Sequence, residues 1–156
     1  LLVATIRRQI KVGRTAAQVW TVLGDPGTIH EWFPGIEACV MSEGDEGPVR
    51  TVTLGSGMQL VEHIVTNDPI AHRFQYRITG GVFQEHLGTI DAIDLDDGTS
   101  LLVYGTDARP DVMALVIGGA SGTALENLRD LVEARTPDEA STPVLDQTDR
   151  PAGGEH

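Results

Sequence analysis

Alternation of apolar and polar residues dominates the first two thirds of the chain and predicts β-strands. Residues 5–12 place Ile6, Ile10 and Val12 among arginines, which is typical of a strand with one solvated face. Six further stretches follow, at residues 36–41, 49–54, 59–66, 73–79, 83–93 and 100–107. Turn sequences rich in Gly, Asp and Asn join them in pairs, so the pattern predicts three consecutive hairpins in one antiparallel sheet.

Helical spacing occurs in three places. Thr15 suits a helix N-cap, and the apolar residues that follow it share one helical face (Ala16, Val19, Trp20 and Leu23). A short second helix is predicted at residues 28–33. A long one is predicted from residue 110 to about 135, and its length of roughly 36 Å is enough to cross a whole sheet.

The middle of the long helix is rich in glycine, with Gly118, Gly119 and Gly122 close together. Glycine weakens a helix, so these residues need a reason. Three interpretations are open: a close approach to a strand, room for a ligand, or a kink.

Composition narrows the class of protein. A length of 156 residues indicates a single domain, and a net charge of −12 disfavours nucleic acid and anionic membrane as partners. One cysteine excludes an internal disulfide, and no apolar run reaches the ~18 residues that would predict membrane insertion. The N-terminal apolar residues are too few for a signal peptide, so we expect a cytoplasmic protein. Zinc-protease, calcium-loop and dinucleotide motifs are absent, so we expect no metal and no cofactor.

The C-terminal stretch differs from the rest of the chain. From residue 136 onward the sequence is polar and Pro-rich, with five acidic residues and one arginine. We therefore predict a folded domain over residues 1–135 and an acidic tail over 136–156 that is flexible on its own.

Three motifs in the predicted strands carry a resemblance to a known family. They are Gly-Pro-Val-Arg-Thr-Val-Thr-Leu at 47–54, Val-Glu-His at 61–63, and Asp68-Pro69 followed by Arg-Phe-Gln-Tyr-Arg-Ile at 73–78. In order and spacing they resemble the START/Bet v-like (SRPBCC) helix-grip superfamily, and more closely its bacterial polyketide cyclase/dehydrase branch. The resemblance extends from about Ile6 to Ala134.

The resemblance implies an α+β fold in which a seven-stranded curved antiparallel sheet wraps around a long C-terminal helix, with two short helices after strand 1. Element order agrees, because seven antiparallel strands need more cover than two short helices provide. The resemblance also implies a deep cavity between sheet and helix that takes lipids, polyketides or other mostly apolar molecules. Some members of the family catalyse cyclisation or dehydration.

From this resemblance and the strand alternation we expect eight residues to line the cavity and bind the ligand: Arg50, Glu62, Tyr76, Ile78, His86, Tyr104, Ile117 and Ser121. Three more are expected at the pocket entrance: Trp32, Phe33 and Met58. Glycines on either side of Met58 predict a mobile loop there.

Several of these residues have a second interpretation. In an apolar cavity Glu62 would have a raised pKa and could act as acid or base, whereas the alternative is a buried ion pair with Arg50 or Arg77. His86 is either a ligand contact or base, or a partly exposed strand residue. The two tyrosines either orient a ligand or pack in the core, and the entrance residues Trp32 and Phe33 could simply plug the open end of the sheet.

Three functions remain open on the sequence. The favoured one is the binding of a small apolar molecule, which would be the partner. The second is an aromatase/cyclase or dehydratase that uses Glu62 or His86 with a tyrosine. The third is a protein-interaction module whose cavity is filled by its own side chains, and a homodimer is an open possibility.

Overall fold

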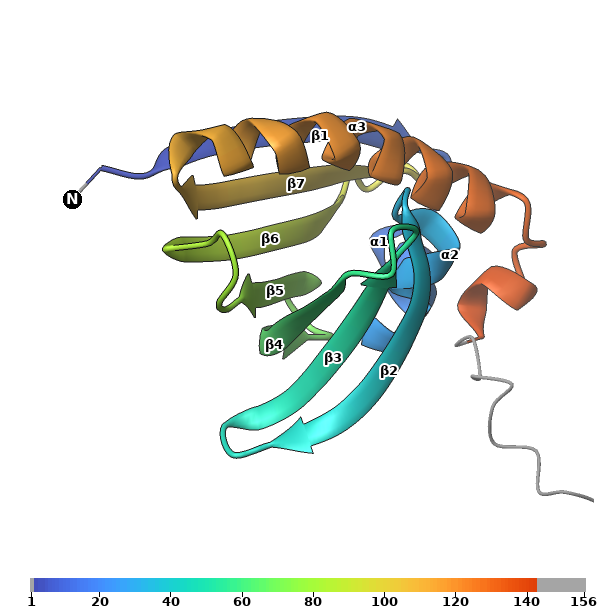
Figure 1. Cartoon of the computed structure of the whole chain (residues 1–156). Helices are drawn as coiled ribbons and strands as arrows, with labels where there is room; N and C mark the ends of the chain where they lie inside the picture. The colour runs from blue at the N-terminus through green and yellow to red at the C-terminus, as the bar shows by residue number, and fades with distance from the viewer. Residues whose placement is uncertain (1, 143–156) are drawn as a thin grey trace, which may run out of the picture.

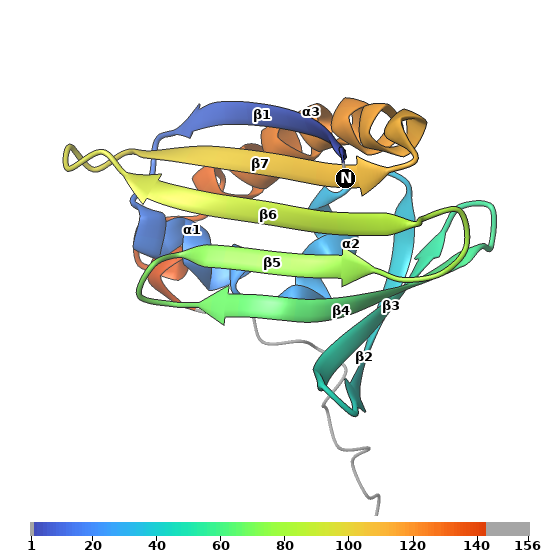
Figure 2. The same cartoon turned by 90° about the vertical axis from the view of Figure 1, so that its left-hand side faces the viewer.

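The computed structural model describes residues 2–142 and contains one seven-stranded antiparallel sheet. Its strands lie in the order β1-β7-β6-β5-β4-β3-β2, so every neighbouring pair except β1–β7 is a hairpin (Figure 2). The strand bounds are β1 (Ala4–Val12), β2 (Ile36–Gly44), β3 (Gly47–Leu54), β4 (Gln59–Asp68), β5 (Arg73–Ile78), β6 (Glu85–Asp94) and β7 (Ser100–Arg109). The predicted hairpins and the antiparallel sheet are confirmed.

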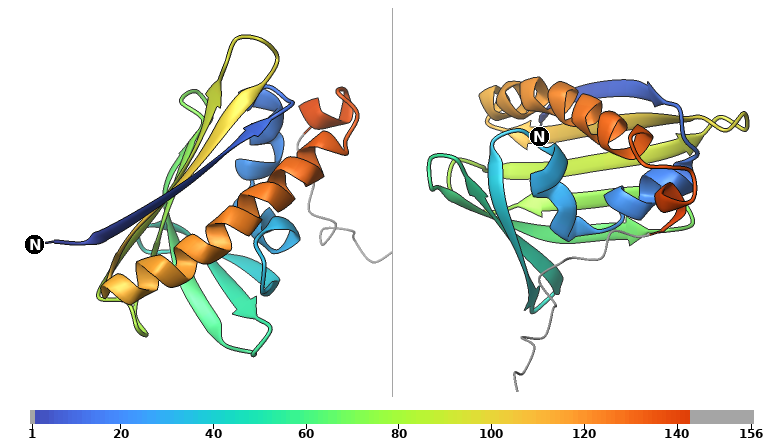
Figure 3. Two further views of the ribbon diagram at one scale, coloured as in Figure 1. Left: turned by 90° about the horizontal axis from the view of Figure 1, so that it is seen from above. Right: turned by 90° about the vertical axis from the view of Figure 1, so that its right-hand side faces the viewer.

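The helices gather on the concave face of this sheet (Figures 1 and 3). They are α1 (Ala16–Leu23), the 3-10 turn η1 (Pro26–Thr28), α2 (Ile29–Trp32), the long α3 (Asp111–Glu133) and the 3-10 turn η2 (Glu139–Ser141). Helix α3 packs mainly against β1 and β7, while β2 and β3 curve away at the opposite side of the sheet. This is the expected helix-grip arrangement, with two short helices after the first strand.

Local sequence explains the short helices. The side chain of Thr15 accepts a hydrogen bond from the backbone of Gln18, whose own side chain accepts one from the backbone of Thr15, so a reciprocal cap starts α1. After α1, the side chain of Asp25 accepts a bond from the backbone N–H of Gly27. This turn presents the carbonyl of Pro26 to the sheet, where it becomes part of the site described below.

Close packing of α3 on β1 depends on Gly118. A Cβ atom at this position would lie 2.4 Å from Cγ2 of Ile6, whereas one at Gly119 would have nothing within 4 Å. Of the three interpretations of the helical glycines, close approach to a strand is therefore the one that applies to Gly118.

The sheet opens between the end of β5 and the start of β6. Their pairing ends at Tyr76 and Gly88, and beyond it the backbone N–H of Ile78 donates to Nδ1 of His86 at 3.0 Å. The side chain of His86 thus takes the place of a strand partner. The chain then turns through residues 79–84, which places a loop over the inner face of the sheet.

The start of the predicted acidic tail lies against α1. Nε2 of Gln18 donates to the carbonyl of Pro137 at 3.5 Å, and the guanidinium of Arg135 donates to the Thr21 hydroxyl at 3.0 Å. Residues 143–156 of that tail lie outside the described residues. The boundary at residue 135 stays a prediction.

Candidate functional site

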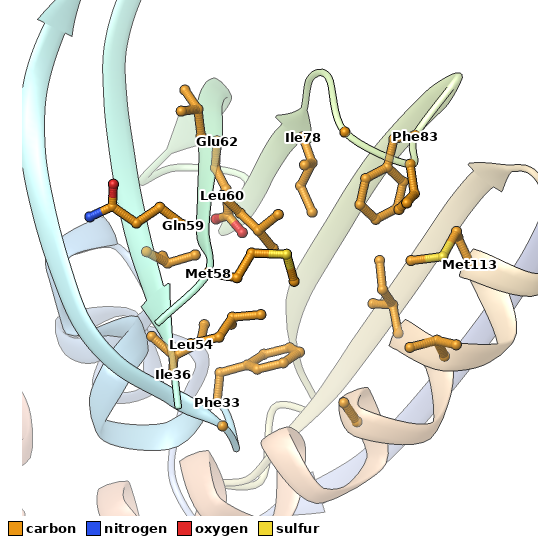
Figure 4. Close-up of a pocket in the computed structure, with 18 of the residues that line it drawn as sticks. Phe33, Ile36, Leu54, Met58, Gln59, Leu60, Glu62, Ile78, Phe83 and Met113 are labelled. Carbon is orange, nitrogen blue, oxygen red and sulfur yellow. The ribbon is translucent and has the colours of Figure 1, made fainter. Parts of the chain in front are cut away.

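A cavity of about 500 Å³ lies between the inner face of the sheet, the loop after β5 and helix α3 (Figure 4). Its wall is mostly apolar. The sheet and its edges contribute side chains such as Ile36, Leu54, Leu60 and Ile78, the loop contributes Val82 and Phe83, and α3 contributes Met113, Ile117 and Ala120. Among the described residues of the wall, Glu62 is the only charged one, with Gln59, Tyr76 and Thr79 as the other polar side chains.

The carboxylate of Glu62 points into this cavity from β4 (Figure 4). Its Oε2 accepts a hydrogen bond from Nε of Arg50 at 2.5 Å, and both side chains are almost fully buried. The sheet register makes the two residues direct neighbours across β3 and β4. Of the two arginines considered as partners for Glu62, the structure selects Arg50.

The guanidinium of Arg50 is enclosed by protein. Nη1 donates to the carbonyl of Pro26 at 3.1 Å, and the charged carbon lies 4.9 Å from the ring centre of Tyr76 and 5.3 Å from that of Phe74. Of the three guanidinium nitrogens of Arg50, Nη2 is the one that is buried without a hydrogen-bond partner in residues 2–142. Cation–π contacts and one ion pair therefore hold this charge behind the cavity wall.

Behind the wall, the hydroxyls of Tyr76 and Tyr104 are hydrogen-bonded to each other. Burial raises the pKa of both phenols, and the negative charge of Glu62 adds to the effect, so both remain neutral. Tyr76 reaches the cavity, whereas Tyr104 is covered by Tyr76 and by Phe33, whose ring centre is 6.3 Å away.

The position of the Tyr76 ring depends on Gly88, its partner across β5 and β6. A Cβ atom at residue 88 would lie 2.3 Å from Cε1 of Tyr76. The ring therefore occupies the space over the glycine, and a side chain at residue 88 would displace it.

His86 lies beside the cavity, in the gap between β5 and β6. Since Nδ1 accepts from Ile78, the neutral ring carries its proton on Nε2, which is buried without a hydrogen-bond partner among the described residues. Burial, and secondly the positive charge of Arg77, lower the pKa of His86 from 6.5 to about 4. The imidazole is neutral near pH 7 and packs against Tyr76 and Phe83, each with its ring centre 5.2 Å away.

The mouth of the cavity is bordered by exposed apolar side chains. Met58, Val82 and Val116 each belong to the wall and are 56%, 62% and 59% exposed. They come from the β3–β4 turn, the loop after β5 and helix α3 respectively. Such a border favours the entry of an apolar molecule over that of a strongly hydrated one.

Six of the residues singled out from the sequence border the cavity: Phe33, Met58, Glu62, Tyr76, Ile78 and Ile117. The other five were expected on the wall or at the entrance and instead lie behind it: Trp32, Arg50, His86, Tyr104 and Ser121. Whether any of the eleven contacts a ligand stays a prediction.

A specific contact holds each of the five residues that lie behind the wall. The Ser121 hydroxyl donates to the carbonyl of Ile117 within α3 at 2.8 Å. Nε1 of Trp32 donates to the hydroxyl of Thr28 at 3.4 Å, which directs the indole into the core. Arg50, His86 and Tyr104 are held by the contacts described above.

Sequence reasoning missed the wall residues of the loop after β5, above all Val82 and Phe83. A signal was present, because two apolar residues directly after Gly80-Gly81 are unusual for a solvated turn. Gln59, Leu60 and Met113 were also missed. Their placement depends on how strongly the sheet curves.

Neither a cluster of metal-binding side chains nor a membrane-spanning helix is found in the described part of the chain. Residues 2–142 contain no group of three or more His, Cys, Asp or Glu side chains placed to hold a metal ion. Within the same range, no helix combines the length and the apolar character needed to cross a bilayer.

Comparison with known families gives one match that covers most of the chain. Residues 3–133 match the family described as polyketide cyclase / dehydrase and lipid transport. A comparison with curated proteins gives no significant match.

Solved structures share the fold. ZhuI aromatase/cyclase from Streptomyces sp. R1128 has a TM-score of 0.74 at 19% identity, over 86% of this chain and 96% of that one. Norcoclaurine synthase from Thalictrum flavum, in complex with dopamine and hydroxybenzaldehyde, has a TM-score of 0.68 at 17% identity, over 86% and 89%. A protein from Thermobifida fusca has a TM-score of 0.67 at 26% identity, over 83% and 93%.

Proposed function

The chain belongs to the polyketide cyclase / dehydrase and lipid transport family, and from this premise we propose that it binds a small, mostly apolar molecule in the cavity between its sheet and α3. The observation that carries the proposal is the cavity itself. About 500 Å³ of space with an almost wholly apolar wall lies within the range of volumes typical of small-molecule sites.

This space argues against an interaction module with a filled interior. The protein's own side chains do not fill the cavity, and the exposed side chains of Met58, Val82 and Val116 make its mouth apolar. Burial of a ligand's apolar surface would supply most of the binding free energy.

Binding is also favoured over catalysis by the pairing of Glu62. A general acid or base needs a carboxylate or imidazole that can exchange a proton with the substrate. Glu62 is held as an ion pair by Arg50, and His86 lies behind the wall with a lowered pKa. An aromatase/cyclase or dehydratase based on Glu62 would first have to break this buried pair.

Titration with a neutral fluorescent probe, N-phenyl-1-naphthylamine, tests the proposal. We expect saturable enhancement of its fluorescence at one site per chain, and displacement by apolar metabolites. Ala120→Trp, which would fill the cavity from α3, should weaken probe binding at least about tenfold.

The matched control is Leu115→Trp, which places the same indole on an exposed position of the same helix outside the cavity wall. This variant should bind the probe like the unmodified protein. Equal binding by the unmodified protein and Ala120→Trp would show that the probe sits elsewhere and would contradict the proposal.

A further inference from the structure

We propose that the ligand of this cavity is a neutral or cationic molecule with a hydrogen-bond donor, a hydroxyl or an amine, that bonds to the carboxylate of Glu62, and that ionised carboxylates are rejected. This inference rests on the proposed binding function. It adds the chemical class that the cavity accepts.

The hydrogen bonds of Glu62 are the first observation. Its Oε2 accepts from Nε of Arg50, and no second protein donor to the carboxylate occurs among the described residues. Arg50 donates to Glu62 through Nε alone, since its Nη1 donates to Pro26 and its Nη2 has no hydrogen-bond partner among the described residues. A carboxylate has about four acceptor sites, so most of the capacity of Glu62 is left for donors that arrive in the cavity.

The direction of the carboxylate is the second observation. Glu62 is part of the cavity wall, and its carboxylate points into the space among Leu60, Met58 and Ile78 (Figure 4). In such apolar surroundings a donor on the ligand is the natural partner for the remaining lone pairs. A buried acceptor that is left unsatisfied lowers the affinity, because its lost hydration is not replaced.

The distribution of positive charge is the third observation. No Lys, Arg or His belongs to the described wall of the cavity. The nearest guanidinium, that of Arg50, is 1% exposed and screened by the rings of Tyr76 and Phe74. An anionic ligand would therefore lose its hydration beside a negative carboxylate and find no cation to compensate.

The tyrosine pair does not change this balance. The hydroxyls of Tyr76 and Tyr104 are hydrogen-bonded to each other, and burial raises the pKa of both phenols. The two residues are therefore neutral and add no charge to the cavity. The electrostatic character of the wall is set by Glu62, which selects donors and repels anions.

Four anthracene derivatives of similar size test the inference: anthracenemethanol, its methyl ether, anthracenemethylamine and anthracenecarboxylate. Their intrinsic fluorescence allows direct titration of the full chain at neutral pH. We expect the alcohol and the amine to bind at least about tenfold tighter than the ether, and the carboxylate to bind more weakly than the ether.

Variants of Glu62 connect the preference to this residue. In Glu62→Gln the amide offers both a donor and an acceptor, so the ratio of alcohol to carboxylate affinity should fall at least about tenfold. The single variant leaves the buried Arg50 without its counter-charge. The double variant Arg50→Gln/Glu62→Gln removes both charges, so it tests the same ratio of affinities without an unpaired buried charge. The control is Glu37→Gln, which removes an exposed carboxylate outside the cavity wall and should leave the ratio unchanged.

The outcomes separate this inference from the proposed function. If the ether or the carboxylate binds as tightly as the alcohol, the cavity binds apolar molecules, but the inference that Glu62 selects ligands with a hydrogen-bond donor is wrong. If the ratio is the same in Glu62→Gln and in the unmodified protein, the inference is also wrong. If none of the four compounds binds, the proposed function fails together with it.

Discussion

Nε of Arg50 lies 2.5 Å from Oε2 of Glu62, and the two residues face each other across neighbouring strands with their side chains buried. This pair has two consequences for the structure. It neutralises a charge in the core on one side, and on the other it holds a carboxylate at the wall of an apolar cavity.

Removal of one partner should destabilise the protein far more than removal of both. We expect Glu62→Leu and Arg50→Met each to lower the free energy of unfolding by about 3–5 kcal/mol, because each leaves an uncompensated buried charge. The double variant should lose less than either single one. Urea denaturation of the four proteins measures this coupling, and additive losses would show that the two charges do not interact.

Substitution of Gly88 should disturb the cavity through Tyr76. In Gly88→Ala the new Cβ would lie 2.3 Å from Cε1 of Tyr76, so we expect a loss of about 1–3 kcal/mol in unfolding free energy and weaker probe binding. Gly105→Ala on β7 is the control, since its Cβ would be no closer than 3.9 Å to the carbonyl of Thr89. Thermal unfolding and probe titration would contradict this account if the two variants behaved alike.

The two adjacent glycines of α3 should respond in opposite directions. Gly118→Ala would place a Cβ 2.4 Å from Cγ2 of Ile6 and force α3 away from β1, at a cost of about 1–3 kcal/mol. Gly119→Ala meets open space and should raise the free energy of unfolding by up to about 1 kcal/mol, because alanine favours the helix. Chemical denaturation measures the free energy of unfolding of both variants. A loss of stability in Gly119→Ala would refute the conclusion that residue 119 faces open space.

Acid should weaken the fold through His86. Burial, followed by the charge of Arg77, lowers the pKa of its imidazole from 6.5 to about 4, so the unfolded chain binds a proton that the folded protein rejects. The stability that comes from the neutral ring is complete above pH 6.5 and is lost as the pH falls toward 4. The difference corresponds to about 3 kcal/mol.

Measurements of unfolding free energy between these two pH values should therefore show a smaller loss in His86→Gln than in the unmodified protein. Gln retains an acceptor for the backbone N–H of Ile78, which limits other effects. The control is His30→Gln, which removes an exposed histidine and separates the loss of any histidine from the loss of this one. Parallel pH profiles for His86→Gln and the unmodified protein would contradict the prediction.

Much of the fold can be predicted from local sequence patterns. Turn sequences such as Asp96-Asp97-Gly98-Thr99 and the alternation on either side of them predict the hairpins that the structure contains. The strand ends are less well predicted, and β6 begins at Glu85 rather than at Phe83. The reason is that Phe83 turns toward the cavity and His86, a contact that no local pattern contains.

The candidate site is only partly predictable for a related reason. Both faces of β4 carry apolar and polar residues, so alternation alone leaves the direction of Glu62 open. The strand register decides it, by placing Glu62 opposite Arg50 and Ile78. Tyr104 and Ser121 have suitable residue types for a polar contact, but packing against Phe33 and a bond within α3 hold them behind the wall.

The sequence by itself determined the order of strands and helices along the chain and the antiparallel sheet, because periodicity, turn residues and capping act over a few neighbouring positions. It indicated the family through the resemblance of its strand motifs, which the match over residues 3–133 confirms. Only the tertiary structure decided that Arg50 is the partner of Glu62, that Gly118 and not Gly119 touches β1, and that Val82 and Phe83 close the cavity. Each of these depends on the curvature of the sheet and on contacts between residues far apart in the chain. The same contacts leave one carboxylate at the wall of an otherwise apolar space.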